Sequence, residues 1–303
     1  MSFKIVTLQS VFFTTVLFVS GLTKSAEISP SHVYKMVNNI ANELTLIHEV
    51  NESEVTYSPF EINDRRPRHV IQKAREIYSK VQKLREINDL TVNSIPDFPT
   101  SEIKPAHVFE IISLILNDVK ELSEPFGVEE DAAKASMPSN KTPNDVYLYL
   151  VKISDMIDSL DIPATVPNDV YQLAKTVIND IEIIREKLGV NGNVKLVTGS
   201  SGKTPADVYL ESRDLLSSIK QLCNKNIRFC LPGGVVVPTS YAGAIKPTHV
   251  LDTLNNVLAE LGAIKSILAI SKPTVLSGAP SGKTPSDVFD VVLSAKRAVD
   301  NIK

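Results

Sequence analysis

Four of the five histidines in this 303-residue chain occupy one position relative to a nearby proline. They lie in segments of the form Pro-x-[His/Asp]-Val, two residues after the proline, and aspartate takes that position in four further segments. In chain order the eight residues are His32, His69, His107, Asp145, Asp169, Asp207, His249 and Asp287. Imidazole nitrogens and carboxylate oxygens are common ligands of Zn²⁺. If the first four segments run parallel, their starts bring together a possible zinc ligand set of His32, His69, His107 and Asp145.

A local role in each segment accounts for the same position without a metal. Whether this position holds histidine or aspartate correlates with the residue before the proline. Threonine precedes the proline in three of the aspartate segments, and lysine or arginine precedes it in three of the histidine segments. The last four segments offer three aspartates and one histidine, which is a different set of ligands. We therefore interpret the position as part of the first turn of a helix. Binding of a metal or a small ligand at these positions remains the alternative function.

Two glycine-containing segments resemble phosphate-binding loops. They are residues 199–204 (GSSGKT) and 278–284 (GAPSGKT). In such loops the backbone amides surround a phosphate, while the lysine and threonine reach the outer phosphates and Mg²⁺. Neither segment has the spacing Gly-x4-Gly-Lys-Thr, and proline follows the threonine in both. We interpret them as turns that lead into helices, and we expect no cofactor.

A cluster of basic residues surrounds the start of the second segment. It consists of Arg65, Arg66, Arg68, Lys73 and Arg75. A solvated helix face is the ordinary reason for such a run of charge. The sharper hypothesis is that these five residues form a docking patch for an anionic partner.

Catalytic chemistry and nucleic-acid binding are not favoured by the sequence. The sequence shows no recognisable set of a nucleophile, a general base and a group that orients the base, so we predict a protein that is not an enzyme. The chain has a net charge of −3 and contains no tryptophan. Nucleic-acid binding needs a basic surface and aromatic rings for stacking, so no nucleic-acid partner is expected.

Cys223 and Cys230 are the only cysteines in the chain. In an exported protein, two cysteines this close in sequence predict a local disulfide. Their spacing is not Cys-x-x-Cys, which disfavours a redox-active pair.

The elements that must position all these residues are helices, because each segment carries the signals of a helix start. In the unit Lys-Thr-Pro-x-Asp-Val-Tyr, threonine can accept a hydrogen bond from a first-turn amide. Proline suits the first helical position, and the aspartate completes a capping box. The prolines of the eight copies are Pro30, Pro67, Pro105, Pro143, Pro167, Pro205, Pro247 and Pro285.

Apolar residues follow each proline with the period of a helix. Counted from the proline, positions three, ten, fourteen and seventeen are apolar in all eight copies. Steps of three and four place these residues in one stripe along a helix. We predict an all-α fold of eight helices, each about 20 residues and about 30 Å long.

The spacing of the prolines divides the chain into two similar halves. Successive steps are 37, 38, 38, 24, 38, 42 and 38 residues. Residues 103–108 (IKPAHV) also match residues 245–250 (IKPTHV). We predict two tandem four-helix bundles, formed by residues 27–162 and 163–303, with long strap-like connections packed on the helices. The spacing leaves parallel and antiparallel helices both open.

The first 26 residues have the pattern of a secretory signal peptide. Lys4 precedes a largely apolar stretch from Ile5 to Leu22, although an uncleaved membrane anchor is the alternative. After cleavage no membrane span is expected. We therefore predict a periplasmic or extracellular protein that binds or scaffolds another protein or an envelope component.

Overall fold

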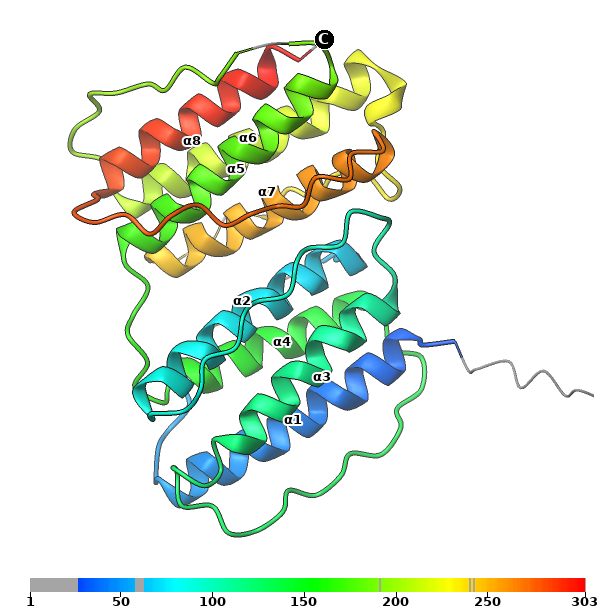
Figure 1. Cartoon of the computed structure of the whole chain (residues 1–303), viewed down its shortest axis with the longest axis vertical. Coiled ribbons are helices and arrows are strands. Elements are labelled where there is room, and N and C mark those ends of the chain that lie inside the picture. Colours follow the sequence, from blue (N-terminus) through cyan, green and yellow to red (C-terminus); the bar gives the residue numbers. More distant parts are fainter. Residues whose placement is uncertain (1–26, 58–62, 191, 240, 242, 303) are drawn as a thin grey trace, which may run out of the picture.

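Eight α-helices and one short 3₁₀ helix make up the part of the chain that the computed structural model describes, and this part contains no strand (Figure 1). It comprises residues 27–57, 63–190, 192–239, 241 and 243–302, so the predicted signal peptide lies outside the described residues. The α-helices are α1 (Pro30–Val50), α2 (Pro67–Ile87), α3 (Pro105–Glu121), α4 (Pro143–Asp158), α5 (Pro167–Lys187), α6 (Pro205–Lys225), α7 (Pro247–Ile267) and α8 (Pro285–Asp300). None of these described helices is long and apolar enough to cross a membrane.

Every α-helix begins at the proline of its segment, which confirms the prediction of an all-α chain with eight helices. At α6 the Thr204 hydroxyl accepts a hydrogen bond from the amide of Asp207 (3.4 Å), and the Asp207 carboxylate accepts one from the amide of Thr204 (2.7 Å). The same reciprocal pair is present at Thr142 and Thr284. Each pair satisfies amides that a helix start otherwise leaves without partners.

The starts of α1 to α4 meet at one end, so these four helices run in the same direction. A small cavity at that end is lined by the proline and the following valine of each helix, namely Pro30, Val33, Pro67, Val70, Pro105, Val108, Pro143 and Val146. Hydrogen bonds also join the starts of α6 and α8 and the starts of α8 and α5. Parallel neighbours explain the long connections, because the chain must return about 30 Å before the next helix begins.

Buried apolar side chains form two clusters. One extends from Val33 to Leu160 and the other from Val170 to Ile302. In the first, α1 and α2 each pack against α3 and α4; in the second, α5 and α6 each pack against α7 and α8. Helices α2 and α7 contact each other as well, and they face one another between the two groups in Figure 1. We call α1–α4 the first group and α5–α8 the second group.

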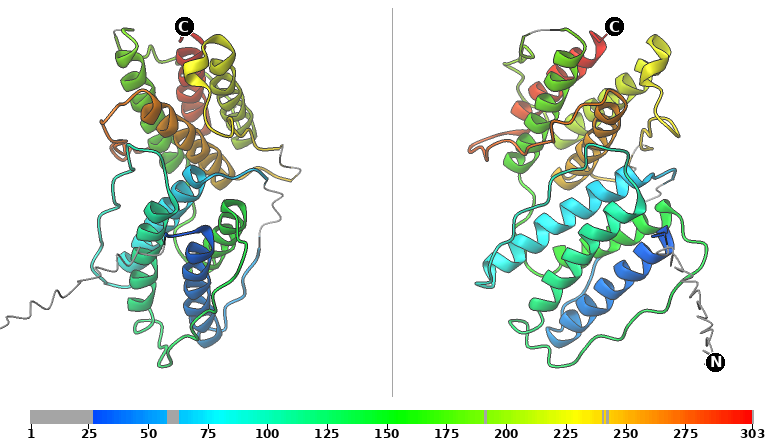
Figure 2. Two further views of the ribbon diagram at one scale, coloured as in Figure 1. Left: turned by 90° about the vertical axis from the view of Figure 1, so that its right-hand side faces the viewer. Right: turned by 45° about the vertical axis from the view of Figure 1, so that its right-hand side comes forward.

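The long connections are held against the helices by side-chain hydrogen bonds, and Figure 2 shows them running along the outside of both groups. After α7, the amide of Ser277 donates to Thr176, and its carbonyl accepts from Gln172. After α3, the amide of Ala135 donates to Asn39 in the same manner. These bonds occupy backbone groups that have no ladder partner within a connection.

Candidate functional site: the α2–α7 interface

The histidines at the helix starts act as caps. In His32, His69, His107 and His249, Nδ1 accepts a hydrogen bond from the backbone N–H of the residue before the proline, at 3.1, 2.9, 3.2 and 3.0 Å. Aspartate makes the same bond at the other four helices. A ring that accepts at Nδ1 carries its proton on Nε2 and is neutral. The histidine is therefore the equivalent of the acid in a capping box.

These caps occupy the residues of the predicted zinc ligand set. Nδ1 of His32, His69 and His107 and the carboxylate of Asp145 are each bonded to their own helix start. Nε2 of His69 also donates to Glu260 on α7 (2.8 Å). Across the described ranges, no group of three or more histidine, cysteine or acidic residues is placed to hold a metal ion.

The lysines of the two loop-like segments pack on aromatic rings of neighbouring helices. Nζ of Lys203 lies 4.1 Å from the ring centre of Phe289 on α8, and Nζ of Lys283 lies 4.6 Å from that of Tyr171 on α5. The backbone N–H of each lysine donates to a side chain in the first turn of the same neighbour. Both lysines thus join two helix starts, as expected for turns that lead into helices.

The five basic residues predicted as a docking patch lie mainly against the second group. The contacts are Arg65 with Asn256, Arg66 beside Gly233, Arg68 with Glu260 and the carbonyls of Pro232 and Gly234, Lys73 with Asp252, and Arg75 with the carbonyl of Pro96. Arg65, Arg68 and Lys73 are only 6%, 8% and 3% exposed. The partners of Arg68 and Lys73 are carboxylates of the same chain, and Arg65 bonds the side-chain oxygen of Asn256. Burial leaves these three side chains little surface for a separate partner.

Glu260 is the centre of this interface. It is fully buried and accepts hydrogen bonds from Nε of Arg68 (2.9 Å), Nε2 of His69 (2.8 Å) and the amide of Val236 (3.1 Å). Burial favours the neutral acid, but the bond from His69 and the charge of Arg68 lower the pKa of Glu260. Burial lowers the pKa of His69 to about 4, even though Glu260 opposes that shift. The pair is thus a neutral donor and a carboxylate, with Arg68 as the balancing charge.

A second charged cluster lies further along the same two helices. Nζ of Lys73 donates to both Glu76 and Asp252 at 2.8 Å, and the side-chain Nδ2 of Asn255 donates to Glu76 (3.0 Å). Burial and the neighbouring Asp252 raise the pKa of Glu76 to about 7. Burial also disfavours the charge on Asp252, but Lys73 reverses this effect and lowers its pKa. Two carboxylates from different groups therefore share one buried lysine.

A cleft of about 430 Å³ opens beside this cluster. Its walls come from α2, α5 and α7 and from the connections that follow α2 and α7. Arg75, Glu76, Lys80, Lys83 and Asp169 are among its charged lining residues. The volume lies in the range of small-molecule sites, and such sites often lie between domains.

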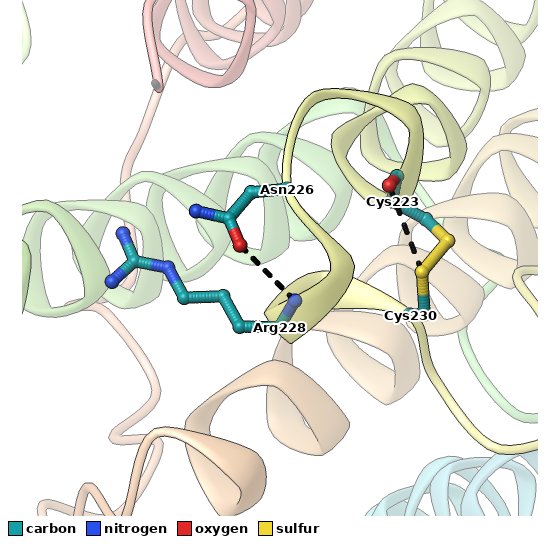
Figure 3. The surroundings of a disulfide bond; sticks show 4 residues. All are labelled: Cys223, Asn226, Arg228 and Cys230. Atoms are coloured by element: carbon teal, nitrogen blue, oxygen red, sulfur yellow. Dashed lines mark hydrogen bonds between the residues drawn. A yellow bond between two sulfur atoms is a disulfide. The ribbon is translucent and has the colours of Figure 1, made fainter.

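The disulfide loop is a separate surface feature (Figure 3). Cys223 at the end of α6 is bonded to Cys230, which follows the 3₁₀ helix Ile227–Phe229, and this confirms the predicted pair. Oδ1 of Asn226 accepts a hydrogen bond from the amide of Arg228 (3.1 Å) and shapes the turn. Phe229 is buried, whereas Ile227 is 86% exposed. A bonded cysteine pair is compatible with an oxidising, exported location.

Replacing His69 by alanine should cost more stability than replacing His107, although both residues cap a helix in the same way. His107→Ala removes only a cap, so we expect a loss of about 1 kcal/mol. His69→Ala also removes a buried donor to Glu260, which adds about 1–3 kcal/mol. Urea unfolding of both variants at pH 7 measures the difference, and equal losses would show that His69 has no special role at α7.

The pH dependence of His69→Ala provides a second readout. The pKa of His69 in the folded protein, about 4, lies below its ordinary value of 6.5. The stability linked to the neutral ring is therefore complete above pH 6.5 and declines as the pH falls towards 4. The excess stability of the wild type over His69→Ala should shrink across that range, whereas no such trend is expected from a purely apolar contact.

The charged α2–α7 interface, the cleft beside it and the disulfide loop are the three features that could serve a function. Comparison of the chain with protein-family models, with curated proteins and with solved structures found no match.

Proposed function

We propose that the chain is an exported binding or scaffold protein, not an enzyme, built from two tandem four-helix domains at residues 27–162 and 163–303. The observation that supports this most is the buried, charged interface between α2 and α7. Ion pairs with well-satisfied hydrogen bonds fix one mutual geometry, because any other arrangement leaves a buried charge without a partner. A fixed relation between two surfaces is what a scaffold needs to hold partners in a defined arrangement.

The exposed end of the disulfide loop is the proposed contact with a protein or envelope partner. Ile227 projects its apolar side chain into solvent (86% exposed) between the two bonded cysteines. A loop that is already closed loses little conformational freedom on binding, which favours affinity. Arg228, which lies over the buried ring of Phe229 (4.8 Å to its centre), adds a positive charge at the same place.

Site-specific photocrosslinking in cells that produce the protein tests this proposal. A photoreactive amino acid at Ile227 should capture a discrete partner in the exported fraction. The matched control is Leu210, a 51% exposed apolar residue of α6 away from the loop. Identical products from both positions, or none from Ile227, would count against the loop as a partner site.

A further inference from the structure

The cleft between α2, α5 and α7 combines one incompletely paired cation with an apolar wall. Most of its charged groups already have partners. Nζ of Lys83 lies 3.6 Å from a carboxylate oxygen of Asp169, and Nζ of Lys80 lies 2.6 Å from one of Asp158. The carboxylate of Glu76 accepts hydrogen bonds from Lys73 and Asn255. These pairs leave little unsatisfied charge of either sign at their positions.

Arg75 is the exception among the cations that line the cleft. Its guanidinium is partly buried, donates to the carbonyl of Pro96 and lies over the ring of Phe98 (6.0 Å to its centre). Within the described ranges it forms no ion pair, because Asp97 acts on it only from beyond contact distance. Burial lowers the pKa of Arg75 to about 10, which shows that the neighbouring groups compensate its charge incompletely. A planar guanidinium in such a place pairs best with a carboxylate or another planar anion.

Apolar side chains also line the cleft. Leu173 on α5 and Leu258 on α7 line it, and Val275 and Leu276 from the α7–α8 connection lie at its edge with 64% and 52% of their surface exposed. Neighbouring Ser277 and Thr274 are bonded to α5, so this edge is held in place. Exposed apolar side chains on a fixed edge would be covered by the apolar part of a ligand.

We propose that this cleft binds a small organic carboxylate with an apolar body. Arg75 pairs with the carboxylate, and Leu173, Leu258 and Leu276 contact the body. The cavity of about 430 Å³ is large enough for a short acyl chain or a single ring. An amine is disfavoured because two lining carboxylates, Glu76 and Asp169, already face lysines, and the third, Asp97, acts on Arg75, whose positive charge repels an ammonium group. This site is independent of the disulfide loop, so it adds to the proposed scaffold function without depending on it.

Octanoate is the probe for the test, with octanol, octylamine and acetate as comparators that lack the charge, reverse it or lack the chain. Isothermal titration of the full-length protein should show saturable binding of octanoate in the micromolar to millimolar range. The three comparators should each bind at least about tenfold more weakly. Equal binding of octanol and octanoate, or no binding of octanoate at millimolar concentration, would overturn the proposal.

Two variants locate the site. Arg75→Gln should weaken octanoate binding at least about tenfold, whereas Arg228→Gln, a control at the distant disulfide loop, should leave it unchanged. If Arg75→Gln does not fold, Leu276→Asp provides the same test, because that side chain is half exposed and its replacement should leave folding intact. Its carboxylate would repel octanoate, so undiminished binding by a folded Leu276→Asp or Arg75→Gln protein would overturn the proposal.

Discussion

Replacing Glu260 by glutamine is expected to lower the free energy of unfolding by about 3–5 kcal/mol. Three donors converge on this buried carboxylate, from Arg68, His69 and the amide of Val236. Glutamine offers a single acceptor oxygen, and its amide group would face one of the three donors. Arg68 would also remain buried without a balancing charge. Urea unfolding at pH 7 measures the loss.

An exposed glutamate provides the control for this substitution. Glu186 lies on the surface of α5, so Glu186→Gln should change stability by no more than about 0.5 kcal/mol. If Glu260→Gln were as mild as this control, the contacts of Glu260 with Arg68 and His69 would contribute nothing to holding the two groups together.

Replacing Phe98 by alanine should cost about 3–5 kcal/mol, the usual loss for a buried aromatic ring. Phe98 is 4% exposed and belongs to the connection between α2 and α3. It lies over Gly262 on α7, where an added Cβ would come within 2.6 Å of a ring carbon. The ring therefore packs the α2–α3 connection of the first group against α7 of the second group.

A double-mutant cycle distinguishes the specific contact between Phe98 and Gly262 from the general effect of burying the ring. In the wild-type background Gly262→Ala should destabilise by about 1–3 kcal/mol, because the methyl group meets the ring. In the Phe98→Ala background the methyl group has space, and alanine favours a helix over glycine by about 1 kcal/mol. The effect of Gly262→Ala should therefore change sign between the two backgrounds. The same cost in both would contradict the contact.

Much of the fold could be predicted because its signals are local. Each helix start is specified by only a few neighbouring residues: the proline, the residue before it, and the aspartate or histidine two positions after it. The apolar stripe then indicates the buried face, whereas the predicted length of about 20 residues is too long for α3, α4 and α8, which have 17, 16 and 16 residues. The two cysteines are near neighbours, so their pairing required no knowledge of the tertiary structure. The histidine cap was accessible for the same reason, although the role of Nδ1 in it was not.

The pairing of α2 with α7 could not be predicted, because it joins residues about 190 positions apart that each look like ordinary helix surface. A weak signal does exist. Asp252, Asn255, Asn256 and Glu260 form a polar row at steps of three, one and four on α7, opposite in sign to the basic start of α2. Only the structure shows that the two rows are buried against each other. Whether neighbouring helices run parallel or antiparallel could not be predicted either, since the connections are long enough to return along a helix.

The proposal that these buried charges join two independently folding halves is tested most directly by separating the halves. Residues 27–162 and 163–303, produced as separate proteins, should each unfold cooperatively, because each contains a complete apolar cluster. Titration of one into the other by calorimetry should then show binding, and Glu260→Gln in the second half should abolish it. Two folded halves that show no binding to each other would contradict the role assigned to the α2–α7 interface. So would halves that bind equally well when the second carries Glu260→Gln.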